Sequence, residues 1–250
     1  MIKTEKQIEK IEKSGKILSA VLKSLKNAAK EGIDLISLDN MAHKQIKELG
    51  AKPAFLGYRP YGAKVPFPAS ICASVNEVVV HGVPKKYFLK SGDVLKIDIG
   101  VDWQGGITDA AVTVPIGKVT AKNLDLISTT KRALVEAIRA AKPGKTLGDI
   151  GFAIERTISN KGFHIIEGLT GHGVGIEIHE EPVIYNFGKP GAGIKLRPGM
   201  VLAIEPMTSI STGRIVQLPD DSFATADNSP SAHFEHTILI TEKGSRVVTE

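Results

Sequence analysis

Residues 96–113, KIDIGVDWQGGITDAAVT, decide the class of fold. Apolar and polar residues alternate on both sides of a WQGG turn at 103–106, a pattern typical of a hairpin. We therefore expect antiparallel strands at 93–100 and 107–114. Two carboxylates lie within these apolar strands.

These carboxylates, Asp98 and Asp109, lie near the middle of the expected strands. A lone buried carboxylate is costly unless it is paired, protonated or bound to a metal. A hairpin that turns symmetrically about Trp103 and Gln104 would place the two side chains directly opposite each other, with Cβ atoms about 5 Å apart. Because two like charges this close repel, we expect a divalent cation between them. Carboxylates that share one proton or cap turns are the alternatives.

Three further segments carry potential ligands: GHGVGIEIHEEP with His172, LAIEPM with Glu205 and HFEHTILIT with Glu235. The glycines around His172 allow close approach to a ligand and positive φ. Taken singly, the histidine could be a hydrogen-bonded turn residue and each glutamate an edge residue. Taken together with Asp98 and Asp109, they form a set of four carboxylates and one imidazole. Such a set suits Mn²⁺, Fe²⁺, Co²⁺ or Zn²⁺ and fits poorly with a sulfur-rich structural zinc site.

Four acidic groups in one dry site would need about two dications to offset their charge. Two cations roughly 3.5–4 Å apart can lower the pKa of a bridging water to about 7. The sequence therefore predicts a metal-bridged hydroxide that attacks a carbonyl.

The length and composition limit which classes of protein this chain can belong to. The 250 residues, 42% of them apolar, suit one compact body, and we expect a single domain over 1–250. Cys72 is the only cysteine, which excludes an intrachain disulfide. The opening residues alternate charged and apolar groups, unlike a signal peptide, and no run approaches the ~18 residues of a membrane span. We therefore expect a cytoplasmic protein with no membrane segment.

The remaining sequence predicts an α+β protein built from two similar halves. Apolar spacing and capping signals predict helices at 5–30, from Ser37 as N-cap to Leu49, and at 121–141 and 146–160. Strands are expected at 70–82, 163–167, 200–206 and 232–241. AAKEG at 28–32 is echoed by AAKPG at 140–144. We expect antiparallel sheet covered by helices, with the site between the halves.

Seven motifs occur in a characteristic order: NEVVVHG, KIDIG, ITDAAVT, GHGVG, HEEP, IEPM and HFEHT. In them the chain resembles the type I methionine aminopeptidases, a family with the pita-bread fold, from about residue 5 to residue 248. The resemblance implies pseudo-two-fold halves and two divalent ions, Co²⁺, Mn²⁺, Fe²⁺ or Zn²⁺. The implied metal ligands are Asp98, Asp109, His172, Glu205 and Glu235, with Asp109 and Glu235 bridging.

The resemblance also implies an activity, the removal of initiator methionine from nascent proteins with a small second residue. It assigns His81 to substrate contact and transition-state stabilisation, and His179 to the scissile carbonyl or the following peptide group. Glu205 would carry a proton from the attacking water to the leaving amine. For each histidine, a packed core position is the alternative.

By family position the methionine pocket would be lined by Phe55, Tyr58, Phe67 and Cys72, an apolar wall suited to a thioether. Packing of aromatic residues in the core is the alternative for these side chains. An insertion within 59–68 leaves open whether Tyr61 or Phe67 takes the second aromatic place.

Two further departures from the family pattern lie near the substrate. Ile178 stands where an aromatic residue usually precedes the histidine of HEEP, and 218–230 replaces the common Trp-bearing segment. Both leave the metal ligands intact. We expect them to change specificity more than chemistry.

Three alternatives share the expected fold. A prolidase or aminopeptidase P usually has an extra N-terminal domain, and a type II methionine aminopeptidase has a helical insertion between its last ligands. A non-catalytic binding module would typically lose ligands.

The expected partners follow from composition and family. The formal charge of +5 is compatible with transient ribosome association, but the absence of any Lys/Arg block of five or more favours simply a soluble basic protein. The expected partners are nascent polypeptide N-termini, with no membrane and no specific nucleic-acid recognition. The resemblance implies a monomer.

Overall fold

The computed structural model describes residues 2–59 and 65–250. Within them the chain forms four helices: α1 (Glu5–Ala28), α2 (Leu35–Glu48), α3 (Ala121–Ala140) and α4 (Leu147–Ser159). These agree with the expected helices to within a few residues. No helix in this part of the chain is long and apolar enough to cross a membrane.

Each helix begins at a polar N-cap that accepts a hydrogen bond from the amide three residues later. The expectation that Ser37 caps the second helix is wrong. Asp34 is the cap, and its Oδ1 accepts from the amide of Ser37 at 3.0 Å. The carboxylate satisfies an amide of the first turn, so the helix begins earlier than expected.

The first half of the chain forms a four-stranded antiparallel sheet. Its strands are β1 (Lys52–Pro53), β2 (Ile71–Val75), β4 (Val94–Trp103) and β5 (Gly106–Pro115). β4 pairs with the other three. A separate antiparallel sheet joins β3 (Val78–Val80) to two later strands, β12 (Phe223–Thr225) and β11 (Ile215–Gln217).

The β4–β5 hairpin has a register different from the expected one. Gln104 and Gly105 form its two-residue turn with φ values of 53° and 79°, so the turn is centred one position later than expected. As a result Asp109 lies opposite Gly100, and Asp98 lies opposite Ala111. The two carboxylates are therefore diagonal neighbours on one face of the sheet, and the expected direct opposition is wrong.

The second half forms a five-stranded antiparallel sheet in the order β15-β14-β9-β7-β8. Its strands are β15 (Gly244–Val247), β14 (His236–Thr241), β9 (Val201–Ile204), β7 (Gly171–Gly173) and β8 (Glu180–Ile184). A short sheet contains β13 (Ser231–His233), β10 (Met207–Ser209) and β6 (His164–Ile165). The single strand expected at 232–241 is divided, because β13 pairs with β10 whereas β14 pairs with β9.

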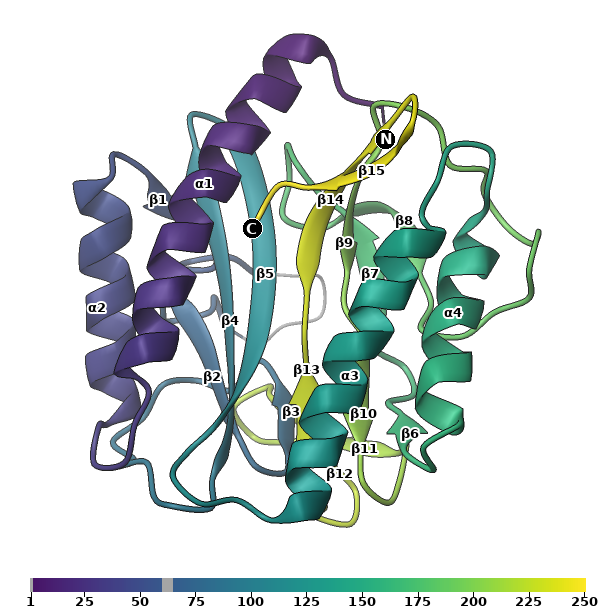
Figure 1. Cartoon of the computed structure of the whole chain (residues 1–250). Coiled ribbons are helices and arrows are strands. Elements are labelled where there is room, and N and C mark those ends of the chain that lie inside the picture. The colour runs from purple at the N-terminus through teal and green to yellow at the C-terminus, as the bar shows by residue number, and fades with distance from the viewer. Residues whose placement is uncertain (1, 60–64) are drawn as a thin grey trace.

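Each half has its own hydrophobic core. The first includes Leu18 of α1, Leu38 of α2 and Ile97 of β4, and the second includes Ile154 of α4 and Leu202 of β9. Burial of each such side chain stabilises the fold by about 1.5–3 kcal/mol. Figure 1 shows α1 with α2, and α3 with α4, lying over the strands of their own half. Antiparallel sheets in two helix-covered halves are the expected architecture.

Candidate metal centre

The two halves are joined along a seam where β5 runs beside β13 and β14. Thr237 Oγ1 donates to the carbonyl of Asp109 at 2.8 Å and accepts from the amide of Asp109 at 2.9 Å. Thr113 Oγ1 contacts His233 in the same way, donating to its carbonyl at 2.6 Å and accepting from its amide at 2.9 Å. These paired hydrogen bonds hold the strands of the two halves in one register.

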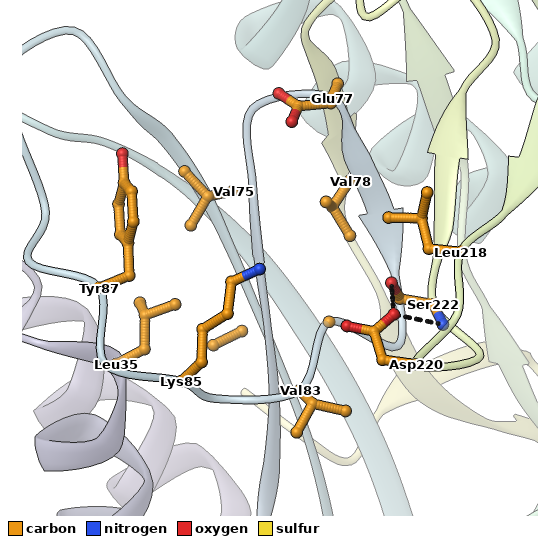
Figure 2. A pocket seen from close by; sticks show the side chains of 12 residues that line it. Leu35, Val75, Glu77, Val78, Val83, Lys85, Tyr87, Leu218, Asp220 and Ser222 are labelled. Carbon is orange, nitrogen blue, oxygen red and sulfur yellow. Dashed lines mark hydrogen bonds between the residues drawn. The ribbon is translucent and has the colours of Figure 1, made fainter.

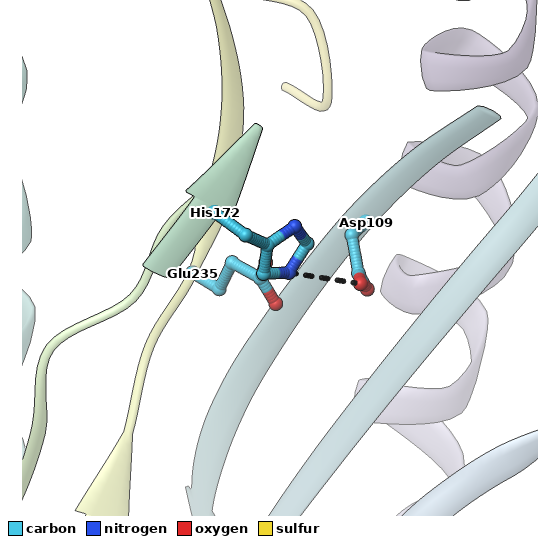
Figure 3. Close-up of side chains that lie close together, drawn as sticks. All are labelled: Asp109, His172 and Glu235. Carbon is cyan, nitrogen blue, oxygen red and sulfur yellow. Dashed lines mark ion pairs between the residues drawn. The ribbon is translucent and has the colours of Figure 1, made fainter. Parts of the chain in front are cut away.

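Glu235 lies at the middle of this seam, between β13 and β14. Its amide donates to the carbonyl of Ala111 at 2.9 Å. Asp109, His172 and Glu235 each offer a ligand atom, and these atoms all lie within 4.8 Å of one another. Figure 3 shows the three side chains converging from β5, β7 and the segment before β14. The seam thus brings together ligands from distant parts of the sequence.

The four predicted carboxylates are all buried. Asp98 and Glu205 are 9% exposed, Asp109 is 3% exposed and Glu235 is 2% exposed. Oδ1 of Asp98, Oδ1 of Asp109 and Oε1 of Glu235 have no hydrogen-bond partner among the residues that the structure describes. Buried oxygens of this kind are costly without a partner, and a divalent cation would provide one.

Burial raises the pKa of all four carboxyl groups. It brings the pKa of Asp98 to about 6, and it holds the pKa values of Asp109, Glu205 and Glu235 well above the ordinary range. Asp98 and then Glu205 raise the pKa of Asp109 further by charge repulsion. Burial thus disfavours the charged forms of these groups, and a bound dication would offset that cost. The donor set therefore fits divalent metal.

His172 lies in β7 and is oriented by its own strand. Because a carbonyl can only accept, the Nδ1–H of His172 donates to the Gly173 carbonyl at 2.8 Å, which leaves Nε2 free as a ligand. Nε2 is 3.4 Å from Glu205 Oε1 and 3.9 Å from Asp109 Oδ2. Burial lowers the pKa of His172 to about 3, so the imidazole is neutral, the form that binds metals.

The glycines beside His172 act mainly through their lack of a side chain. A Cβ on Gly171 would lie 2.5 Å from the Ala203 carbonyl oxygen, and one on Gly173 would lie 2.3 Å from the Glu181 carbonyl oxygen. The expectation of positive φ holds only for Gly175, at 134°. It is wrong for Gly171 and Gly173, which lie in an extended strand that neighbouring backbone approaches closely.

A sixth group, His233, was missed by the sequence analysis. It is 1% exposed, and its Nε2 lies 3.2 Å from Glu205 Oε2. Glu205, His233 and Glu235 form a second set of ligand atoms within 4.8 Å of one another. The available signal was a histidine two residues before Glu235 in an apolar segment, but nothing local distinguished it from a packed histidine.

His179 lies next to His172, with ring centroids 4.5 Å apart, and is exposed. Its Nδ1 is 2.8 Å from the hydroxyl of Tyr58. His179 also lines an open hollow of about 480 Å³ whose other lining residues include Gln7 and Glu177. Of the residues predicted to contact substrate, His179 lines this hollow.

His81 follows β3 and adopts a φ of 59°, a left-handed conformation that is uncommon for a side-chain-bearing residue. Phe223 of β12 packs edge-on against its ring, with centroids 5.9 Å apart. Desolvation by surrounding protein, followed by the imidazoles of His179 and His233, lowers the pKa of His81 although the residue is exposed to solvent. His81 therefore belongs to the same group of imidazoles.

The four predicted pocket residues lie in one apolar cluster. Phe55 and Cys72 are buried with Ile178, and Tyr58 and Phe67 pack against them. Cys72 faces Asp98 across the β2–β4 pair, so the apolar cluster adjoins the carboxylates. Tyr61, the other candidate for the second aromatic place, lies outside the described residues.

Residues 218–230, where a departure from the family pattern was expected, lie beside His81. They include β12, which pairs with β3 just before His81. They also close a cavity of about 150 Å³ whose lining includes Gly82, Lys85, Leu218 and Asp220 (Figure 2). This segment therefore packs against His81 and contains none of the predicted metal ligands.

Comparison with known proteins assigns the chain to a family. Residues 9–242 match metallopeptidase family M24. The chain belongs to this family. Among M24 relatives, it is 44% identical to the methionine aminopeptidase of Aquifex aeolicus (strain VF5), over 99% of this chain and 97% of that protein. It is 40% identical to methionine aminopeptidase 1 of Bacillus subtilis (strain 168), over 99% of this chain and 98% of that protein.

Solved structures agree with this M24 assignment. The methionine aminopeptidase of Thermotoga maritima superposes with a TM-score of 0.95 at 42% identity, covering 100% of this chain and 99% of that one. The prolidase of Pyrococcus furiosus gives a TM-score of 0.80 at 25% identity, covering 100% of this chain and 65% of that one.

These findings confirm the resemblance to methionine aminopeptidases, the pita-bread fold and the assignment to metal-dependent peptide hydrolases. The individual roles given to ligands, histidines and pocket residues stay predictions.

Proposed function

We propose that the chain removes N-terminal methionine from nascent polypeptides and prefers a small second residue. The observation that carries this proposal is the convergence of four buried carboxylates and His172 directly beside the apolar Phe55–Cys72 cluster. The first group is suited to hydrolysis and the second to a thioether side chain.

Two divalent cations are proposed as cofactors, held by five buried residues: Asp98, Asp109, His172, Glu205 and Glu235. Four of them belong to the two sets of neighbouring ligand atoms, and Asp98 is the diagonal neighbour of Asp109 on one face of the sheet. When bound, such cations lower the pKa of water and polarise a carbonyl. Asp109 and Glu235 are the proposed bridging carboxylates. Glu235 supports this role because it belongs to both sets of neighbouring ligand atoms.

Glu205 is the proposed proton carrier. Its Oε1 lies 3.4 Å from His172 Nε2, and its Oε2 lies 3.2 Å from His233 Nε2. A carboxylate in this position would take a proton from water and return it to the leaving amine. Both transfers need this group within hydrogen-bond reach of the reacting atoms.

His179 and His81 are proposed to hold the substrate. The phenol of Tyr58 contacts His179 Nδ1, which favours a fixed ring whose Nε2 is available to the scissile carbonyl or the next peptide group. His81 would contact the substrate and stabilise the transition state. The part of the substrate peptide that follows the scissile bond would extend into the hollow lined by His179 and Glu177.

The methionine side chain is proposed to bind against the apolar cluster. Phe55 and Phe67 meet edge to face, with centroids 6.4 Å apart, and Cys72 closes the cluster next to Asp98. A thioether packs well against aromatic edges and a thiol. Of the two aromatic candidates, Phe67 is supported by its place in the cluster.

The wider setting is also proposed. We infer a single catalytic domain over 1–250 that acts as a monomer in the cytoplasm and contacts ribosomes transiently through its positive charge. Ribosome co-sedimentation should weaken as salt rises, and binding that is insensitive to salt would contradict an electrostatic contact.

Cleavage of defined peptides tests the function. Protein loaded with Mn²⁺, Fe²⁺ or Co²⁺ should release methionine from Met-Ala-Ser, leave Ala-Pro peptides intact and lose activity on chelation. Cleavage only before proline would assign the chain to the prolidase activity of its more distant structural relatives. No cleavage with any of the three metals would favour a binding module.

A further inference from the structure

His233 is a buried histidine that the proposed mechanism does not use. Its Nδ1 has no hydrogen-bond partner within the described part of the chain, although the residue is 1% exposed. Its Nε2 lies 3.2 Å from Glu205 Oε2 but does not form a hydrogen bond of good geometry there. A buried imidazole whose nitrogens are not hydrogen-bonded carries a desolvation cost. A ligand that accepts the nitrogen lone pair would remove part of this cost.

The backbone of His233 is held firmly in place. Thr113 bonds both its amide and its carbonyl across the seam between the halves. Residue 233 also pairs with Met207 through the β13–β10 ladder. These contacts fix the backbone from which the ring reaches Glu205, with its Nε2 at 3.2 Å from Oε2.

We propose that Nε2 of His233 is a further ligand of the cation held by Glu205 and Glu235, which adds a second imidazole nitrogen to the centre. The three ligand atoms lie within 4.8 Å of one another, and all three residues are buried. This inference rests on the proposed two-cation function, but it concerns a residue outside the five predicted ligands.

The additional nitrogen changes which cations the centre favours. Oxygen ligands suit Mn²⁺, whereas imidazole suits Zn²⁺, Co²⁺ and Fe²⁺. His233 should therefore increase the preference for Co²⁺ and Zn²⁺ over Mn²⁺. In the competing explanation, His233 only positions Glu205 by a hydrogen bond and has no direct effect on the metal.

Metal binding separates these explanations without reference to activity. Calorimetric titration with Co²⁺ and Mn²⁺ would be performed on the full chain, on His233→Gln and on His164→Gln, a control at an exposed histidine in β6. We expect His233→Gln to weaken one of two Co²⁺ affinities by about 10-fold or more and Mn²⁺ affinity much less. The visible absorption of bound Co²⁺ should also change, while His164→Gln matches the wild type.

Unchanged Co²⁺ affinity and absorption in His233→Gln would overturn the proposal, and so would equal weakening of Co²⁺ and Mn²⁺ without an absorption change. Melting in chelator verifies that the variant folds. If it does not, the wild type labelled with ¹⁵N and loaded with ¹¹³Cd still tests the proposal. One-bond couplings from cadmium to two imidazole nitrogens are expected, and coupling to His172 alone would contradict the ligand role. Failure of the peptide assay would remove the proposed function but leave this test valid.

Discussion

The metal centre and the apolar cluster beside it are built in different ways. The proposed ligands come from β4, β5, β7 and the segments around β9, β13 and β14, which are held by ladder hydrogen bonds and by the seam contacts of Thr113 and Thr237. The apolar cluster draws largely on loop residues such as Phe55, Phe67 and Ile178. The proposed reactive groups are thus placed on or directly beside paired strands, whereas the proposed recognition residues lie largely on loops, which tolerate change.

Replacing a ligand on the strands should have the largest effect. Asp109→Ala should lower kcat/KM by at least about 10³-fold, which corresponds to about 4 kcal/mol, because a bridging carboxylate is lost. Peptide cleavage and metal content would be measured together, with Glu242→Gln in the exposed β14–β15 turn as the control. A variant with full rate would contradict the bridging role, and melting curves would exclude unfolding as the cause.

The pH dependence of stability tests whether burial disfavours the charged form of Asp98. Burial raises the pKa of Asp98 from 3.8 to about 6, so its contribution to stability is fully present below pH 3.8 and is lost as pH rises through about 6. In chelator, Asp98→Asn should therefore gain stability relative to wild type over this range, by up to about 3 kcal/mol.

Denaturant unfolding at pH 4 and pH 8 would measure this gain. Added divalent cation should reverse it, because the wild-type carboxylate then has a partner that the variant lacks. A stability difference that is the same at both pH values would show that Asp98 is not destabilised by its surroundings.

His179 lies between the two regions, so its replacement should have an intermediate effect. His179→Ala should lower kcat by about 10²-fold if the ring stabilises the developing charge on the scissile carbonyl. Tyr58→Phe keeps the imidazole but removes the hydroxyl that contacts Nδ1, and should cost less. Equal kcat losses in both variants would instead assign the effect to the Tyr58 hydroxyl.

The loop-borne cluster should give the smallest effect. Phe67→Leu removes an edge-to-face contact worth about 1 kcal/mol, so KM for Met-Ala-Ser should rise by about fivefold with kcat nearly unchanged. Phe88→Leu, at a residue that is 51% exposed, is the matched control. A large fall in kcat would show that the cluster also positions the reacting groups.

Much of the fold could be predicted from local sequence. The helices follow from apolar spacing, and the hairpin follows from WQGG between alternating strands. Asp98, Asp109, Glu205 and Glu235 were conspicuous because carboxylates in apolar strands require a partner. Helix boundaries were harder to predict where two possible N-cap residues lie close together, as with Asp34 and Ser37 at the start of α2.

Tertiary structure decided the rest. The turn at Gln104 and Gly105 set a register in which the two aspartates are diagonal, and this depends on backbone conformation that the letters alone do not specify. In the sequence, His233 could not be distinguished from a packed core histidine. In the structure, Thr113, 120 positions away, holds its backbone beside β5. Ligand types can be recognised one at a time because burial of charge is a local penalty, but their convergence depends on strand register across the two halves, which only long-range contacts determine.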